Sequence, residues 1–155
     1  MGFREYGDYD AVGLAGLVRG GQVSPSELLD EALARTAAVN PKINAVIHLM
    51  EPRARAAIAA GLPDGPFRGV PFLIKDLMTA FAGEPMRLGS RLFGDYVPAE
   101  DEELTRRYRQ AGLVIFGKTN TPELGVSNVT EPELFGLTRN PWNLERTSSG
   151  SSGGS

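Results

Sequence analysis

Lys75 is the residue whose type and position best suit catalysis. It directly follows the apolar run Val70–Ile74, which is typical of a buried strand. Open α/β sheets place their sites at the carboxyl ends of strands, so Lys75 stands where a catalytic group is expected. Burial disfavours the charged ammonium, and a lysine in an apolar setting can therefore act as a base near neutral pH. The alternative is a solvated Lys75–Asp76 pair at the end of a strand.

Serines that could take part in such chemistry lie in Gly150–Ser155, which reads Gly-Ser-Ser-Gly-Gly-Ser. Glycines allow close approach and unusual backbone dihedral angles, so this segment can present a serine hydroxyl. Serine is a weak nucleophile unless a neighbouring base removes its proton. The same composition is also typical of a flexible linker or tail, and taken alone it leaves both interpretations open.

The composition excludes several other chemistries. The 155 residues contain no cysteine and one histidine, His48. A disulfide framework, a thiolate nucleophile and a zinc site built on cysteine are therefore excluded, and no metal or other cofactor is predicted. A Ser-His-Asp triad would depend on His48 alone. Because His48 lies outside every motif, we interpret it as incidental to the chemistry.

Charge and hydropathy argue against nucleic acid and membranes as partners. Sixteen Lys and Arg against nineteen Asp and Glu give a formal net charge of −3, with no basic block. This pattern is unlike that of a nucleic-acid-binding protein. No stretch approaches the roughly 18 apolar residues of a membrane helix. The first six residues carry charge where a signal peptide has its apolar segment, so a cytoplasmic protein is expected.

A phosphate-loop pattern at Gly112–Thr119 is a weak candidate for nucleotide binding. Gly112 is followed, after four residues, by Gly117-Lys118-Thr119. The intervening Leu113–Phe116 are mostly β-formers that would lie within a strand, and no apolar helix follows to bind phosphate. We interpret the pattern as the exit of a strand followed by a turn.

The residues up to 61 are predicted to be helical. Apolar spacing favours a helix over 10–19, ended by a pair of glycines. Ser24-Pro25-Ser26-Glu27 is a helix-start signal, and Asn40-Pro41 is expected to end that helix. An alanine- and arginine-rich helix is expected over 53–60.

The residues 69–155 are predicted to form the sheet portion of the same domain. Strands are expected over 70–74 and 113–116, with a polar helix over 101–111 between them. A helix between two buried strands indicates a βαβ unit and a parallel sheet. The stretch 120–143 is expected to be loop.

Four segments, taken in order, resemble the amidase-signature family. They are Gly69–Asp76, Ala111–Glu123, Gly136 with Asn140–Asn143, and Gly150–Ser155. Four ordered segments are far more specific than any one of them. The resemblance implies an α/β fold, namely the N-terminal part of the amidase-signature fold, with a mixed twisted sheet flanked by helices, here truncated. The run Thr130–Glu133 looks closest to bacterial amidases that open cyclic nylon-oligomer amides.

The resemblance implies amide hydrolysis by a Ser–cis-Ser–Lys triad. Lys75 matches the family's lysine base, and Ser151 matches the bridging serine, which follows a cis peptide bond. Ser152 matches a supporting serine, and Gly150 and Gly153 flank the serine pair. The implied partner is a small-molecule amide. A homodimer of the full-length protein is compatible with this interpretation, because twofold dimers are the commonest soluble oligomers.

The family's nucleophilic serine is expected well beyond the bridging serine and is absent from this chain. Ser155 follows Ser151 by only four residues, too few to match it. We therefore predict that the chain is an amidase fragment that is inactive by itself. The alternative is a non-catalytic scaffold or adaptor derived from an amidase, which would dock through its helical first part.

Overall fold

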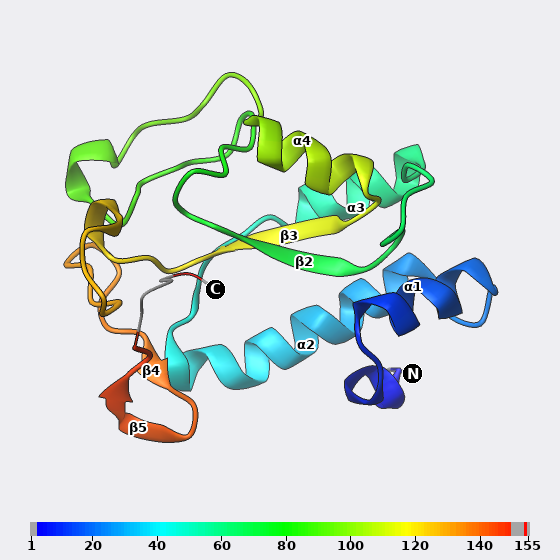
Figure 1. The fold of residues 1–155 in the computed structure, drawn as a ribbon, viewed down its shortest axis with the longest axis horizontal. Coiled ribbons are helices and arrows are strands. Elements are labelled where there is room, and N and C mark those ends of the chain that lie inside the picture. The colour runs from blue at the N-terminus through cyan, green and yellow to red at the C-terminus, as the bar shows by residue number, and fades with distance from the viewer. Residues whose placement is uncertain (1–2, 150–153, 155) are drawn as a thin grey trace.

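The computed structural model describes residues 3–149 and 154, which form an α/β structure around a three-stranded sheet (Figure 1). The strands are β1 (Val46–Leu49), β2 (Pro71–Lys75) and β3 (Val114–Thr119), in the order β1-β3-β2. β2 runs parallel to β3, and β1 runs antiparallel to it. The predicted mixed sheet is therefore confirmed, and β3 is its central strand.

Within the described part of the chain, four α-helices accompany the sheet: α1 (Ala11–Arg19), α2 (Pro25–Ile43), α3 (Glu51–Ala60) and α4 (Glu103–Gln110). α4 connects β2 to β3 and completes the predicted βαβ unit. In Figure 1, α2 and α4 lie on opposite sides of the strands. The short elements are η1 (Arg4–Asp8), η2 (Arg91–Phe93), η3 (Glu123–Gly125), β4 (Arg139–Asn140) and β5 (Asn143–Thr147). Among the residues that the structure describes, no helix has the length and apolar character needed to cross a bilayer.

Helix α2 begins where the sequence predicts but ends later. Ser24 accepts a hydrogen bond from the Glu27 amide, and the Glu27 carboxylate accepts one from the Ser24 amide, which completes a capping box. The expected end at Asn40-Pro41 is wrong, because the helix continues through Pro41. A proline this near the end removes a single helical hydrogen bond, and its fixed φ suits the helix. The helix stops at Asn44, whose left-handed backbone (φ 52°) directs its amide to the Asn40 carbonyl at 2.7 Å.

Strand β3 is longer than predicted and includes Gly117-Lys118-Thr119. The expected turn at these residues is therefore wrong. The Gly112–Thr119 segment is mostly strand and does not form the loop that a phosphate site requires. A glycine is needed at position 117 because an added Cβ would lie 2.7 Å from the His48 carbonyl oxygen and 3.1 Å from the Leu73 side chain. The neighbouring strands thus approach β3 more closely than a side chain permits.

Two further elements lie where the sequence predicts none. β1 lies in the part of the chain expected to be helical, and the β4–β5 hairpin begins within the stretch expected to be loop. β1 has four residues and β4 has two, so neither is long enough to give a clear period-2 pattern. Their formation depends on pairing partners distant in the chain or across a turn.

The core is built on both faces of β3. Val114 and Phe116 pack with Leu29 of α2, whereas Ile115 packs with Ile74 of β2. Alternate residues of a strand point to opposite faces, so both faces of β3 are covered by apolar side chains. This burial fixes the position of the parallel pair, and Lys75 is the last residue of its strand β2.

The close approach at Gly117 predicts a destabilising substitution. Gly117→Ala is expected to lower the free energy of unfolding by about 1–3 kcal/mol, because the new Cβ meets backbone that cannot move aside. Gly16→Ala is the matched control, since Gly16 lies in α1 with no atom within 4 Å of an added Cβ. That change is expected to stabilise the helix by about 0.5–1 kcal/mol. Urea unfolding of both variants measures the difference, and equal stability would contradict the account.

Candidate active site

Lys75 is the last residue of β2 and lies at the carboxyl end of the parallel pair, as the sequence predicts. Its register partner on β3 is Thr119, and residues paired across a sheet point to the same face. Lys75 is half-buried and lines a cavity of about 1040 Å³ between β2 and α4. The wall of this cavity is largely apolar and includes Met78, Leu104 and Tyr108.

One residue of the serine-rich segment, Gly154, lies beside Lys75. The Thr119 hydroxyl donates a hydrogen bond to the Gly154 carbonyl at 2.5 Å. A Cβ on Gly154 would lie 2.9 Å from both Lys75 Cγ and Thr121 Cγ2, and its φ of +86° also favours glycine. The structure thus brings part of this segment against Lys75. The other predicted site residues, Gly150, Ser151, Ser152 and Gly153, lie outside the described residues.

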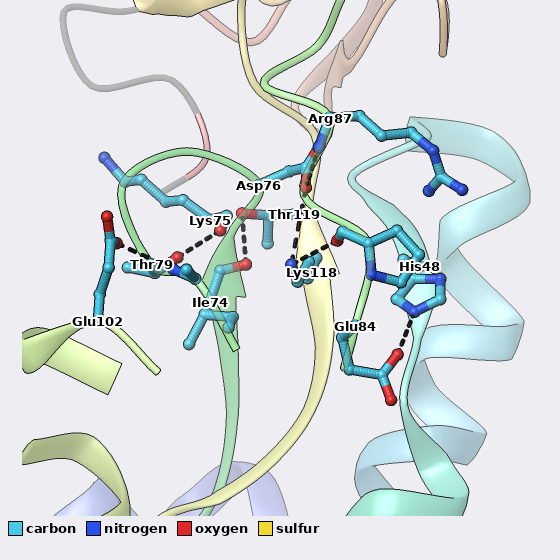
Figure 2. A network of polar contacts seen from close by, with 12 residues as sticks. His48, Ile74, Lys75, Asp76, Thr79, Glu84, Arg87, Glu102, Lys118 and Thr119 are labelled. Carbon is cyan, nitrogen blue, oxygen red and sulfur yellow. Dashed lines mark hydrogen bonds and ion pairs between the residues drawn. The ribbon is translucent and has the colours of Figure 1, made fainter. Parts of the chain in front are cut away.

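The backbone that leaves β2 is fastened to the start of α4. The Thr79 hydroxyl donates a hydrogen bond to the Lys75 carbonyl at 2.5 Å. The next amide, Ala80, donates to the Glu102 carboxylate at 2.9 Å, and the Glu102 amide donates to the Ala80 carbonyl at 3.0 Å. These contacts hold the turn after Lys75 at both ends (Figure 2).

Asp76 is turned into the protein interior, so the alternative of a solvated Lys75–Asp76 pair is wrong. Asp76 is 1% exposed, and its Oδ1 lies 3.9 Å from Nζ of the fully buried Lys118. Both carboxylate oxygens also accept the Arg87 amide, each at 3.1 Å. Burial raises the pKa of Asp76 and lowers the pKa of Lys118, because it disfavours each charged form. Their mutual attraction partly offsets both shifts.

His48, the histidine judged incidental, contributes to a second polar cluster. Its Nε2 lies 2.8 Å from Oε2 of Glu84, whose Oε1 accepts a hydrogen bond from Arg53 Nε at 3.0 Å. Partial burial alone would raise the pKa of Glu84, but the hydrogen bonds from His48 and Arg53 outweigh it and lower the pKa. The cluster fastens the residues before Pro85 to β1 and α3.

Sequence reasoning predicted the position of Lys75 at the end of a strand but missed the buried pair Asp76 and Lys118. Lys118 follows Val114 and Phe116 at every second position of β3. Simple alternation would therefore place it on their face of the sheet, which packs against α2. In the structure Phe72 pairs with Ile115, and the next residue of β2 pairs with Gly117. β3 therefore holds one extra residue, Phe116, which moves Lys118 to the other face. No local pattern in the sequence predicts such a shift in register.

Comparisons with known proteins show the family to which the chain belongs. The amidase family model matches residues 27–155. The chain is 47% identical over 148 residues to a 6-aminohexanoate-cyclic-dimer hydrolase of Paenarthrobacter ureafaciens, covering 94% of this chain and 30% of the relative. It is 40% identical over 154 residues to a glutamyl-tRNA(Gln) amidotransferase subunit of Salinispora tropica, covering 95% of this chain and 31% of the relative.

A solved structure of a 6-aminohexanoate cyclic dimer hydrolase superposes with a TM-score of 0.88 at 46% identity. The match covers 95% of this chain and 30% of that structure. The chain therefore belongs to the amidase family. It spans about 30% of the length of these two relatives, and its fold is the corresponding N-terminal portion of the amidase-signature fold.

The Glu84 cluster predicts a dependence of stability on pH. The stabilisation that its carboxylate provides is fully present above the ordinary pKa of 4.5 and is lost as the pH falls through the lowered folded-state value. Glu84→Gln should therefore lower the melting temperature at neutral pH and weaken the further loss on acidification. Melting curves between pH 7 and acid measure this effect.

The control for this prediction is Glu145→Gln, a change at an exposed position of β5. It is expected to keep the pH dependence of the unchanged chain. An acid dependence of Glu84→Gln equal to that of Glu145→Gln would show that Glu84 does not provide the stabilisation.

Proposed function

We propose that Lys75, with Thr119 and Gly154 beside it, forms the part of an amide hydrolase's active site that contains the lysine base. The observation that carries the proposal is the contact of Gly154, from the serine-rich segment, with Lys75 at the end of β2. Membership of the amidase family supports it. Neither a histidine nor a metal is required, because lysine and serine can move the protons.

In the proposed mechanism Lys75, in its uncharged form, accepts the proton of the Ser151 hydroxyl. Ser151 in turn takes the proton of a nucleophilic serine, whose oxygen attacks the amide carbonyl. Collapse of the tetrahedral intermediate breaks the carbon–nitrogen bond, and the proton returns through Ser151 to the leaving amine. Water then attacks the acyl-enzyme by the same relay and releases the carboxylic acid. Ser152 supports the relay by hydrogen bonding, and Gly150 and Gly153 allow the tight backbone that it needs.

We propose a small, uncharged amide with methylene chains as the substrate. Two observations support this choice: the largely apolar cavity beside Lys75 and the 47% identity to a 6-aminohexanoate-cyclic-dimer hydrolase. Apolar walls with few polar groups favour a substrate of this character. The 6-aminohexanoate cyclic dimer is therefore the first compound to test.

Lys75→Ala in the full-length gene product is expected to abolish hydrolysis of the cyclic dimer, because the relay loses its base. Ser151→Ala is expected to reduce turnover severely and leave a trace. Removing one member of a catalytic triad typically costs about 10⁴-fold or more in kcat. Release of free amine, followed by liquid chromatography, measures turnover. The matched control is Lys42→Ala, which removes an exposed lysine near the end of α2 and should leave turnover unchanged. Wild-type turnover by Lys75→Ala would refute the assignment.

The 155-residue chain alone is expected to show no turnover of the cyclic dimer. The family resemblance puts the nucleophilic serine beyond the residues present here, and removal of a triad nucleophile leaves only residual rate. The same amine-release assay, run on this chain and on the full-length gene product at equal concentration, tests the expectation. Hydrolysis by the 155 residues that Lys75→Ala abolishes would place the nucleophile within this chain.

A further inference from the structure

A buried ion pair behind β2 and β3 takes no part in the proposed proton relay. Lys118 is 0% exposed and Asp76 1% exposed. Burying two charges is costly unless each is paired and hydrogen-bonded, and an apolar pair of the same volume often stabilises a fold as well or better. Stability alone is therefore a poor explanation for charges at these positions.

The pair ties together three segments that are far apart in the sequence. Lys118 Nζ donates a hydrogen bond to the Pro85 carbonyl at 2.5 Å. The Asp76 carboxylate accepts the Arg87 amide, and the Asp76 amide donates to the Thr119 carbonyl at 3.2 Å. The end of β2, the end of β3 and the residues 85–87 thus meet at two charged groups.

Lys118 lies on the opposite face of the strand pair from Lys75. The register places Ile74 opposite Lys118 and Lys75 opposite Thr119, and neighbouring residues of a strand point to opposite faces. Figure 2 shows the Lys75 side chain directed past β2 and away from β3, whereas Lys118 lies at β3 near Asp76. Lys118 is therefore behind the backbone that carries Lys75.

We propose that the Lys118–Asp76 pair is a positioning element for Lys75. Asp76 is the next residue in the chain, so anchoring its carboxylate and its amide fixes the exit of β2 and the direction in which Lys75 leaves it. The Thr79 hydroxyl holds the Lys75 carbonyl from the other side. A buried ion pair enforces one placement, because any other leaves a charge without compensation. The inference rests on the proposed function, because its test measures the rate of amide hydrolysis.

Lys118→Met in the full-length gene product tests the proposal, because methionine is unbranched, keeps most of the length of the lysine side chain and removes the charge. The kcat for the 6-aminohexanoate cyclic dimer is expected to fall about 100-fold, the scale that a misplacement of about 1 Å can cost. KM is expected to stay within about twofold, because the pair is buried away from the cavity. Assays run well below the melting temperature, with the fold checked by circular dichroism. Lys42→Met is the matched control and should keep both constants.

The double variant Lys118→Met/Asp76→Asn separates positioning from stability. Neither charge remains, and the new amide side chain at position 76 still offers an oxygen to the Arg87 amide, so the melting temperature should recover relative to Lys118→Met. Positioning predicts that kcat stays low despite this recovery. Recovery of kcat together with stability would overturn the proposal, as would wild-type kcat in Lys118→Met. If Lys118→Met does not fold, Asp76→Asn is assayed in its place. A kcat of Asp76→Asn within about twofold of the wild-type value would then overturn the proposal.

Lys75→Ala, assayed in parallel, keeps the two proposals distinguishable. Loss of turnover in Lys75→Ala with wild-type kcat in Lys118→Met removes the positioning role and leaves the relay in place. Turnover retained in Lys75→Ala removes the relay itself, whatever the Lys118 variants show.

Discussion

The candidate site depends on the parallel pairing of β2 with β3. β3 is buried on both faces, and Val114, Ile115 and Phe116 are each at most 5% exposed, so its register cannot slip without exposing a core side chain. That register sets Lys75 opposite Thr119 and brings the Thr119 hydroxyl to the Gly154 carbonyl. The neighbourhood of Lys75 is therefore a consequence of how an apolar strand is buried.

A second constraint acts on the segment 76–102, which runs from the end of β2 to the start of α4. Loops of this length inside a domain are uncommon and often functional. Directional polar contacts hold much of this segment: Asp76 with the Arg87 amide, Glu84 with His48, and Glu102 with the Ala80 amide. Such contacts define one geometry more narrowly than apolar packing does, because each requires an orientation as well as a distance. The hydrogen bonds from His48 and Arg53 lower the pKa of Glu84 despite its partial burial, whereas burial raises the pKa of Asp76 against the effect of its polar contacts.

Sequence reasoning succeeded where local signals and tertiary structure agree. The capping box of α2, the apolar runs of β2 and β3, and the polar helix between them each combine a pattern with a matching start or stop signal. It failed where contacts with residues distant in the chain determine the local structure. β1 forms because β3 pairs with it, and Asn44 at the end of α2 donates hydrogen bonds to the Phe135 and Leu137 carbonyls, 91 and 93 residues away. The same distinction applies to the site. The position of Lys75 at the end of β2 was predicted because a strand with a charged exit has a local signature, and its catalytic role stays a prediction. The Asp76–Lys118 pair was missed because it depends on the extra residue in β3. The roles of Ser151 and its neighbours stay predictions that rest on family resemblance.

The two lysines at the ends of β2 and β3 differ in their surroundings, which agrees with the different roles that we propose for them. Lys75 is half-buried on the wall of a cavity, where its side chain is accessible to groups that enter it. Lys118 is fully buried against Asp76 and Pro85, so it can orient backbone but cannot reach a substrate. Relatives with names as different as a cyclic-dimer hydrolase and an amidotransferase subunit match this same part of the chain. A region that proteins with such different names share suits the general proton transfer that we propose for Lys75.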